Sequence, residues 1–154
     1  MERTKQQKHL PFKKNNFDEQ LKILTRMASD SAIYYKHAAA LISGNTIYSS
    51  GINKFIKEIK DKNDKIYYKT MHAEINVFEN FPTKNVKGMD ILVIRVNKSF
   101  TLKNSRPCNQ CIDKLHKIGI RKVYYSNDNG DIVSERVEHM EKLHISSGTR
   151  HLIY

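Results

Sequence analysis

The fold is decided by residues 90–126, which read DILVIRVNKSFTLKNSRPCNQCIDKLHKIGIRKVYYS. The near-continuous apolar run over 89–96 is typical of a strand that is covered on both faces. Pro107 and Gly119 then mark the start and the end of a helix, and residues 120–126 have the pattern of a second strand. A strand–helix–strand unit places its two strands parallel, with a right-handed crossover. The sequence therefore predicts an α/β protein.

The chain on the N-terminal side of this unit adds further helices and a hairpin. Apolar residues recur at helical spacing over 16–31, and the Gly44-Asn45 turn joins two expected strands over 37–53. The lysine-rich residues 54–71 have the pattern of a long connection that is helical in part. Residues 72–81 have the pattern of a helix that a following proline stops. Together with a short strand and a helix expected after residue 130, we expect a three-layer fold, with a mixed sheet of about five strands covered by helices.

Length and composition predict one globular domain. The chain has 154 residues, of which 39% are hydrophobic and 28% charged, which is ordinary for a soluble protein with a core of its own. Residues 1–16 are basic and polar and predict a disordered tail, and residues 17–154 predict a single domain. No apolar run has the length of a membrane span, and the start of the chain lacks the apolar segment of a secretory signal. We therefore expect a cytoplasmic protein without membrane contact, with the nucleus as the alternative.

The net charge of +11 favours a polyanionic partner. Nucleic acid or a phosphate-bearing small molecule would fit such a surface. The lysines are scattered along the chain, however, and Lys, Asn and Ile all have AT-rich codons. Genome composition is therefore an equally good explanation, and charge alone does not assign a function.

The two cysteines, Cys108 and Cys111, indicate a metal site. At positions i and i+3 of the expected helix they share one face, and in its first turn their thiolates gain from backbone N–H groups and the helix dipole. Two cysteines three residues apart make a poor disulfide scaffold. A redox pair of the thioredoxin type usually has a small apolar or Gly-Pro interior, whereas this interior is Asn109-Gln110.

A third ligand must come from another part of the chain, and His72 is the natural candidate. One histidine and two cysteines form a three-ligand zinc set, which leaves a position for water and so favours a catalytic site over a structural one. Zinc lowers the pKa of bound water from about 15.7 to about 7. Glu74 lies two residues after His72 and points away from the ligand face, so it predicts a proton carrier beside the metal-bound water.

The pair of motifs, HAE at 72–74 and PCNQC at 107–111, resembles the zinc-dependent cytidine and deoxycytidylate deaminase family. The resemblance runs from about Ala32 to about Asp131, because KHAAAL, SSGIN, ILVIRV and RKVYYS look like strands of the cytidine deaminase-like fold. It implies self-association, since neighbouring subunits often complete the pocket in this family. It also implies residue roles: His72, Cys108 and Cys111 as zinc ligands, Glu74 as the proton shuttle, Ala73 as a backbone contact to the base, and Asn53 as a contact to the sugar.

The predicted function is hydrolytic deamination of an amino-bearing nucleobase by a zinc enzyme, with cytosine in a nucleoside or nucleotide as the substrate. One alternative is an RNA- or DNA-editing deaminase acting on cytosine or adenine, in which residues 54–71 guide a strand to the pocket. Another is a catalytically silent zinc-containing module that binds nucleic acid through its basic surface, although the intact Glu74 argues against it. We expect His37 to be a surface or packing residue.

Overall fold

A computed structural model describes residues 17–143 of the chain. The disordered tail predicted for residues 1–16 and the last segment, 144–154, lie outside the described residues. The first described element is a helix over 17–29, as the apolar spacing predicts.

The core of the fold is a six-stranded mixed sheet with the order β2-β1-β5-β7-β8, in which β6 also pairs with β5. The strand β5 runs parallel to β7, whereas the other neighbouring strands are antiparallel. The predicted α/β class and mixed sheet are therefore confirmed. The strands are β1 (Lys36–Ser43), β2 (Thr46–Ile52), β5 (Asp90–Val96), β6 (Leu102–Lys103), β7 (Lys122–Ser126) and β8 (Ile132–Arg136).

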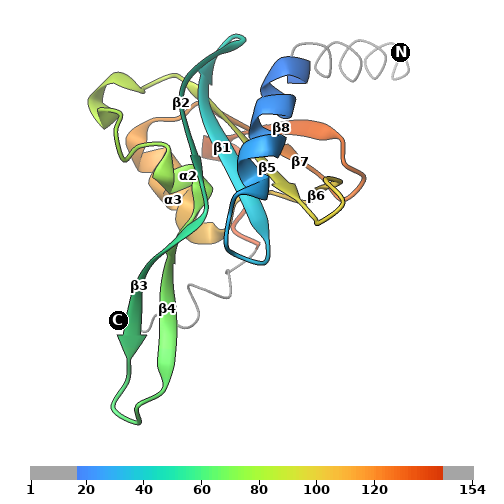
Figure 1. Cartoon of the computed structure of the whole chain (residues 1–154). Coiled ribbons are helices and arrows are strands. Elements are labelled where there is room, and N and C mark those ends of the chain that lie inside the picture. Colours follow the sequence, from blue (N-terminus) through green and yellow to red (C-terminus); the bar gives the residue numbers. More distant parts are fainter. Residues whose placement is uncertain (1–16, 144–154) are drawn as a thin grey trace.

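Helices cover both faces of this sheet, as the predicted three layers require (Figure 1). Alternate residues of β5 point to opposite faces. Leu92 and Ile94 belong to the cluster that includes the helix over 17–29, whereas Ile91 and Val93 belong to the cluster with α2 and α3. The helices on the second face are α2 (Ala73–Asn76) and α3 (Asn109–Ile118), with the 3₁₀ helices η1 (Thr83–Asn85) and η2 (Val137–His139).

Two predicted helices differ from the structure in length or type. The helix expected over 72–81 is the four-residue α2, followed by turns, and the helix expected after β8 is the single 3₁₀ turn η2. By contrast, α3 ends as predicted at Gly119, which adopts a left-handed φ of 98° and donates its N–H to Leu115 and His116. Within residues 17–143, no helix combines the length and the apolarity needed to cross a membrane.

The prediction for residues 54–71 is wrong. This segment forms two antiparallel strands, β3 (Lys54–Lys60) and β4 (Ile66–Met71), which make a two-stranded sheet of their own. The hairpin projects from the body of the protein (Figure 1). Phe55, Ile56 and Ile59 have helix-like spacing, but a helix here would have no core to bury that stripe. Cross-strand pairing satisfies the backbone instead.

Candidate active site

The start of α3 presents the two cysteines. Cys108 is the N-cap residue in an extended conformation (φ −73°, ψ 170°), and Cys111 lies three residues later in the first turn. Pro107 precedes the cap, where a missing N–H leaves no helical hydrogen bond unmade. Cys108 and Cys111 are both buried and unpaired by a disulfide.

The segment that leads into α3 is anchored to the two parallel strands by Ser105. Its hydroxyl donates to the carbonyl of Val93 at 2.8 Å and accepts the N–H of Ser126 at 2.9 Å, and its own N–H donates to the Ser126 carbonyl at 2.8 Å. Val93 is in β5 and Ser126 ends β7. The thiols are therefore held beyond the carboxyl end of β7, where crevices form in α/β sheets.

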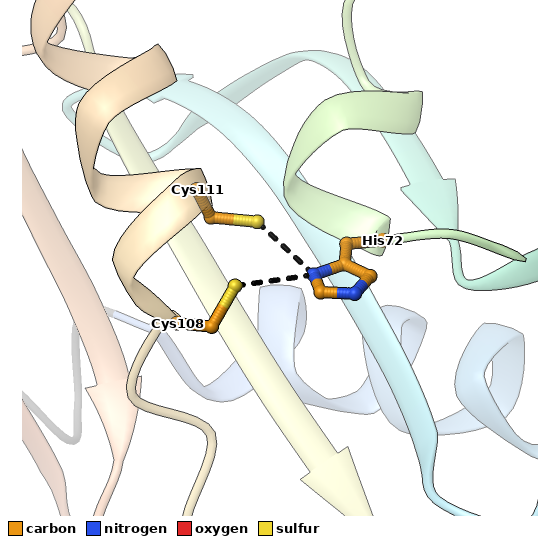
Figure 2. A group of neighbouring side chains, drawn as sticks. All are labelled: His72, Cys108 and Cys111. Atoms are coloured by element: carbon orange, nitrogen blue, oxygen red, sulfur yellow. Dashed lines mark hydrogen bonds between the residues drawn. The ribbon is translucent and has the colours of Figure 1, made fainter. Parts of the chain in front are cut away.

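The histidine comes from the second helix start. His72 follows β4 directly and is the N-cap residue of α2, again in an extended conformation. Its Nδ1 atom lies 3.1 Å from Cys111 Sγ and 3.6 Å from Cys108 Sγ (Figure 2). The three potential ligand atoms all lie within 4.8 Å of one another, so these side chains could hold a metal ion. The structure brings the three predicted ligands together.

The geometry of this group fits zinc. Bond lengths of about 2.3 Å to sulfur and 2.0–2.1 Å to nitrogen in a tetrahedron place neighbouring ligand atoms about 3.5–3.8 Å apart. The distances of 3.1 and 3.6 Å are close to that spacing. Two sulfurs and an imidazole are also the ligand types that zinc prefers.

The three groups influence each other's protonation. Hydrogen bonds with Cys111, the larger cause, and with His72 together lower the pKa of Cys108 to about 3, although burial opposes the change. The same hydrogen bond, together with burial, raises the pKa of Cys111 well above its usual value. A hydrogen bond with Cys108 raises the pKa of His72. One thiolate is therefore already favoured at neutral pH, which suits a cation site.

Glu74 lies beside this group in the first turn of α2. Its side chain is only 4% exposed, and burial raises the pKa of its carboxyl group, while the neighbouring His72 opposes the rise. The carboxyl group is also close enough to the Cys111 thiol to affect the pKa of that thiol. A buried carboxyl group with a raised pKa is suited to accept and return a proton near neutral pH.

The two residues predicted to contact substrate occupy different surroundings. Ala73 is buried as the first residue of α2, where a backbone N–H has no acceptor within the helix. Asn53 is buried between β2 and β3, and its amide bonds the backbone where β1 begins: Oδ1 accepts the N–H of His37 in β1 at 2.9 Å, and Nδ2 donates to the carbonyl of Tyr35, just before β1, at 2.6 Å. Asn53 thus holds the start of β1 against the chain after β2, and its contact to a sugar stays a prediction.

Sequence reasoning missed His37 as a neighbour of the site. It lies in β1, its Nδ1 is 3.1 Å from the carbonyl of Tyr35, and its ring interacts electrostatically with His72 and Cys108. Burial lowers the pKa of His37 to about 4, so the ring is neutral at pH 7. His37 is therefore a packing residue, as expected, and it also lies beside the candidate metal ligands His72 and Cys108. His37 and Ala39 lie two residues apart in the strand and so share a face, and Ala39 belongs to the cluster with α2 and α3.

Comparison with known proteins agrees with this site. A family model of the cytidine and deoxycytidylate deaminase zinc-binding region matches residues 15–127. A protein of Aliivibrio fischeri, described as an uncharacterized deaminase in the luxG 3′ region, is 31% identical over 101 residues, which are 62% of this chain and 61% of the relative. The chain thus covers less than two thirds of that relative's length.

Solved structures share the fold. The dCMP deaminase of the cyanophage S-TIM5, in complex with dCMP and dUMP, superposes with a TM-score of 0.52 at 18% identity, over 77% of this chain and 83% of its own. Cytidine deaminase from Mycobacterium leprae superposes with a TM-score of 0.51 at 13% identity, over 79% of this chain and 93% of its own. The predicted cytidine deaminase-like fold is confirmed.

Proposed function

The chain belongs to the cytidine and deoxycytidylate deaminase family, and we propose that it is a zinc-dependent hydrolytic deaminase of cytosine in a nucleoside or nucleotide. The observation that carries the proposal is the convergence of His72, Cys108 and Cys111 next to the buried carboxyl group of Glu74. Relatives named as cytidine and dCMP deaminases support cytosine as the base.

The three ligands would hold zinc through His72 Nδ1 and the two sulfurs. Zinc bound there supplies a water that is acidic enough to lose its proton at neutral pH. His72 lies at the start of α2, and Cys108 and Cys111 lie at the start of α3. The positive end of the helix dipole there favours the two thiolates. Two thiolates reduce the net positive charge of such a centre, and the dipoles return part of its electrophilicity.

Glu74 would carry the proton in this reaction. Its carboxylate takes a proton from the attacking water and delivers it to the ring nitrogen next to the amino-bearing carbon. The water oxygen forms a bond to that carbon, the carbon–nitrogen bond to the amino group breaks, and ammonia leaves with the second proton. Burial raises the pKa of this carboxyl group above its usual value, which favours its taking up the proton from water. The N–H of Ala73 and the oxygen of Asn53 would orient the base and the sugar.

The test measures ammonia release by the purified protein and by Glu74→Gln, with cytidine, deoxycytidine, CMP, dCMP and adenosine as substrates. Glutamine keeps the size of the side chain but cannot shuttle a proton, so turnover should fall by about 10²–10⁴-fold while zinc stays bound. Glu19→Gln, an exposed carboxylate in the first helix, is the matched control and should retain full turnover. Unchanged turnover in Glu74→Gln, or an inactive wild type that contains zinc, would refute the proposal.

A further inference from the structure

The hairpin of β3 and β4, residues 54–71, is the most conspicuous feature that the proposed function leaves unexplained. It is called the arm below. It is separate from the six-stranded sheet and projects from the body (Figure 1). It carries six lysines against three acidic residues. Its sequence neighbours are both residues of the site, because Asn53 precedes it and His72 follows it. The arm therefore has its base at the candidate active site.

One face of the arm exposes aromatic rings. Strand register places Phe55 opposite Thr70 and Tyr68 opposite Glu58, so that Phe55 and Tyr68 are diagonal neighbours on the same face. Their ring centroids lie 5.5 Å apart, and the side chains are 48% and 55% exposed. Exposed aromatic pairs of this kind can stack on nucleobases without reading their sequence.

The opposite face concentrates positive charge. Lys57 and Lys69 are direct cross-strand partners, an arrangement that is unfavourable for like charges. Neither makes an ion pair with a carboxylate of the described residues 17–143. An anionic ligand between these two ammonium groups would relieve their repulsion.

A second aromatic and cationic group flanks the base of the arm. Tyr34 and Tyr35 are in edge contact, with centroids 4.9 Å apart, and the guanidinium of Arg95 lies 4.5 Å from the Tyr35 ring centroid. The carbonyl of Tyr35 accepts the amide of Asn53 at 2.6 Å, which fixes this loop beside the residue that starts the arm. Exposed rings and cations therefore occur on two segments that meet at Asn53.

We infer that the arm docks a single-stranded polynucleotide that passes around an edge of the hairpin, with bases stacked on Phe55 and Tyr68 on one face and phosphates bound by Lys57 and Lys69 on the other. This inference rests on the proposed function for the deamination of cytosine, and it extends the substrate from a nucleotide to a nucleotide within a strand. Aromatic rings on one face and ammonium groups on the other match the two chemical parts of a nucleotide chain. The charge of the arm opposes docking of a second copy, which would bring two lysine-rich hairpins together. Its direct connection to His72 favours a substrate over a lipid surface.

Lysines on exposed strands also suppress edge-to-edge aggregation. That role alone does not explain the arm, because Phe55, Ile56, Ile66 and Tyr68 are all more than 40% exposed and would promote association. A ligand that covers the rings accounts for both features.

The test is binding of a labelled oligodeoxycytidine of about 12 nucleotides, a length within the site sizes of single-strand binders. Fluorescence anisotropy at several salt concentrations would compare the wild type with Lys57→Gln/Lys69→Gln. The loss of two phosphate contacts should weaken Kd by about tenfold and reduce the slope of log Kd against log salt by about 1.4. Because the substitution removes a repulsive pair, it should not lower the melting temperature, so weaker binding cannot come from unfolding.

The matched control is Lys84→Gln/Lys98→Gln, which removes two exposed lysines outside the arm. It should shift Kd by less than about twofold, because long-range attraction is largely screened at physiological salt. Phe55→Ser/Tyr68→Ser should weaken binding with little change of the salt slope. Equal losses in both lysine variants would overturn the inference, as would no binding by the wild type.

Two other ligands of the arm, a second copy of the chain and a lipid surface, are tested by separate measurements. If the arm variants change only the sedimentation coefficient, the face is an interface between copies; if they change only binding to phosphatidylserine vesicles, it is a lipid surface. Either result overturns the inference. A protein that binds strands through the arm but releases no ammonia supports the inference and refutes the proposed function. A protein that deaminates dCMP, but whose affinity for the strand is unchanged by the arm substitutions, supports the proposed function and refutes the inference.

Discussion

At the scale of single residues, His72 connects the two helix starts. It is the contribution of α2 to a cluster whose other two members come from the start of α3. His72→Ala leaves the two sulfurs in place but removes the nitrogen that lies 3.1 and 3.6 Å from them. Loss of a group that only supports a ligand weakens metal affinity by about 10–100-fold, so loss of the ligand itself should exceed about 100-fold. Zinc content after dialysis, measured by mass spectrometry, checks this.

The control for that substitution is His116→Ala. His116 is an exposed histidine near the end of α3, far along the helix from its cysteines. It should retain one zinc per chain, whereas His72→Ala should retain less than a tenth of that amount, given a loss of more than about 100-fold in affinity. Equal zinc content in the two variants would show that His72 is not a ligand.

The cluster of His72, Cys108 and Cys111 was predictable from the sequence, and the hydrogen bonds around Asn53 and His37 were not. The spacing of Cys108 and Cys111 and the position of Pro107 define a helix start by local rules. The placement of Asn53 and His37 depends on how β1 lies against the chain after β2, which is set by hydrogen bonds between distant residues. Local patterns carry no information about such contacts.

At the scale of elements, the position of α2 depends on its close contact with β2. A Cβ atom at Gly51 would lie 2.8 Å from Asn76 Nδ2 and 2.9 Å from Asn76 Cβ. Asn76 also donates from Nδ2 to the carbonyl of Ile52 at 3.0 Å, so the helix cannot retreat without losing a bond. Gly51→Ala should therefore displace α2 and with it His72. We expect a loss of about 1–3 kcal/mol in the free energy of unfolding and weaker zinc binding.

Urea unfolding and zinc titration would measure both effects. The control is Ser50→Ala, a neighbouring exposed position of β2, which should change the free energy of unfolding by less than about 0.5 kcal/mol. A Gly51→Ala protein with wild-type stability and wild-type zinc affinity would contradict the proposed dependence of the site on this contact.

The elements that bury apolar residues on the sheet were predicted well. β5 is a continuous apolar run and α3 has both a start and a stop signal. The arm was predicted wrongly, because KFIKEIK has helix-like spacing and the strands of the arm gain their stability from each other rather than from the core. An exposed two-stranded sheet leaves little trace in hydrophobic periodicity.

At the scale of the whole molecule, a charged network joins the loop before Cys108 to the C-terminal strands. Arg106 Nε donates to Glu135 Oε2 at 2.8 Å, the Tyr125 hydroxyl donates to the same oxygen at 2.6 Å, and Arg106 Nη2 donates to the carbonyl of Glu141 at 2.8 Å. Burial alone would raise the pKa of Glu135, but the hydrogen bonds from Arg106 and Tyr125 lower it below its usual value.

The lowered pKa makes part of the stability depend on pH. The contribution of Glu135 is present above its unfolded pKa of about 4.3 and is lost as the pH falls through the lower folded value. Glu135→Gln should therefore lower the free energy of unfolding at pH 7 by about 1 kcal/mol, discounted for partial exposure, with a smaller difference below about pH 3. Urea unfolding at both pH values, in the presence of a metal chelator, checks this. A difference in the free energy of unfolding between wild type and Glu135→Gln that grows toward acid pH would contradict it.

Zinc should also stabilise the chain as a whole, since a ligand that binds only the folded state adds to its stability. Free zinc at about 100 times its Kd adds about 2.7 kcal/mol. For a chain of 154 residues this corresponds to a rise in Tm of about 5–10 °C. Thermal unfolding with zinc and after chelation would measure the shift. In His72→Ala the shift should largely disappear, and an equal shift in that variant would point to zinc binding elsewhere.

The most direct measurement is zinc K-edge X-ray absorption of the purified full-length protein. The account predicts one zinc per chain, with two sulfur neighbours at about 2.3 Å and nitrogen or oxygen neighbours at about 2.0–2.1 Å. Protein without zinc, or a zinc shell without sulfur, would contradict the claim that His72, Cys108 and Cys111 bind one ion.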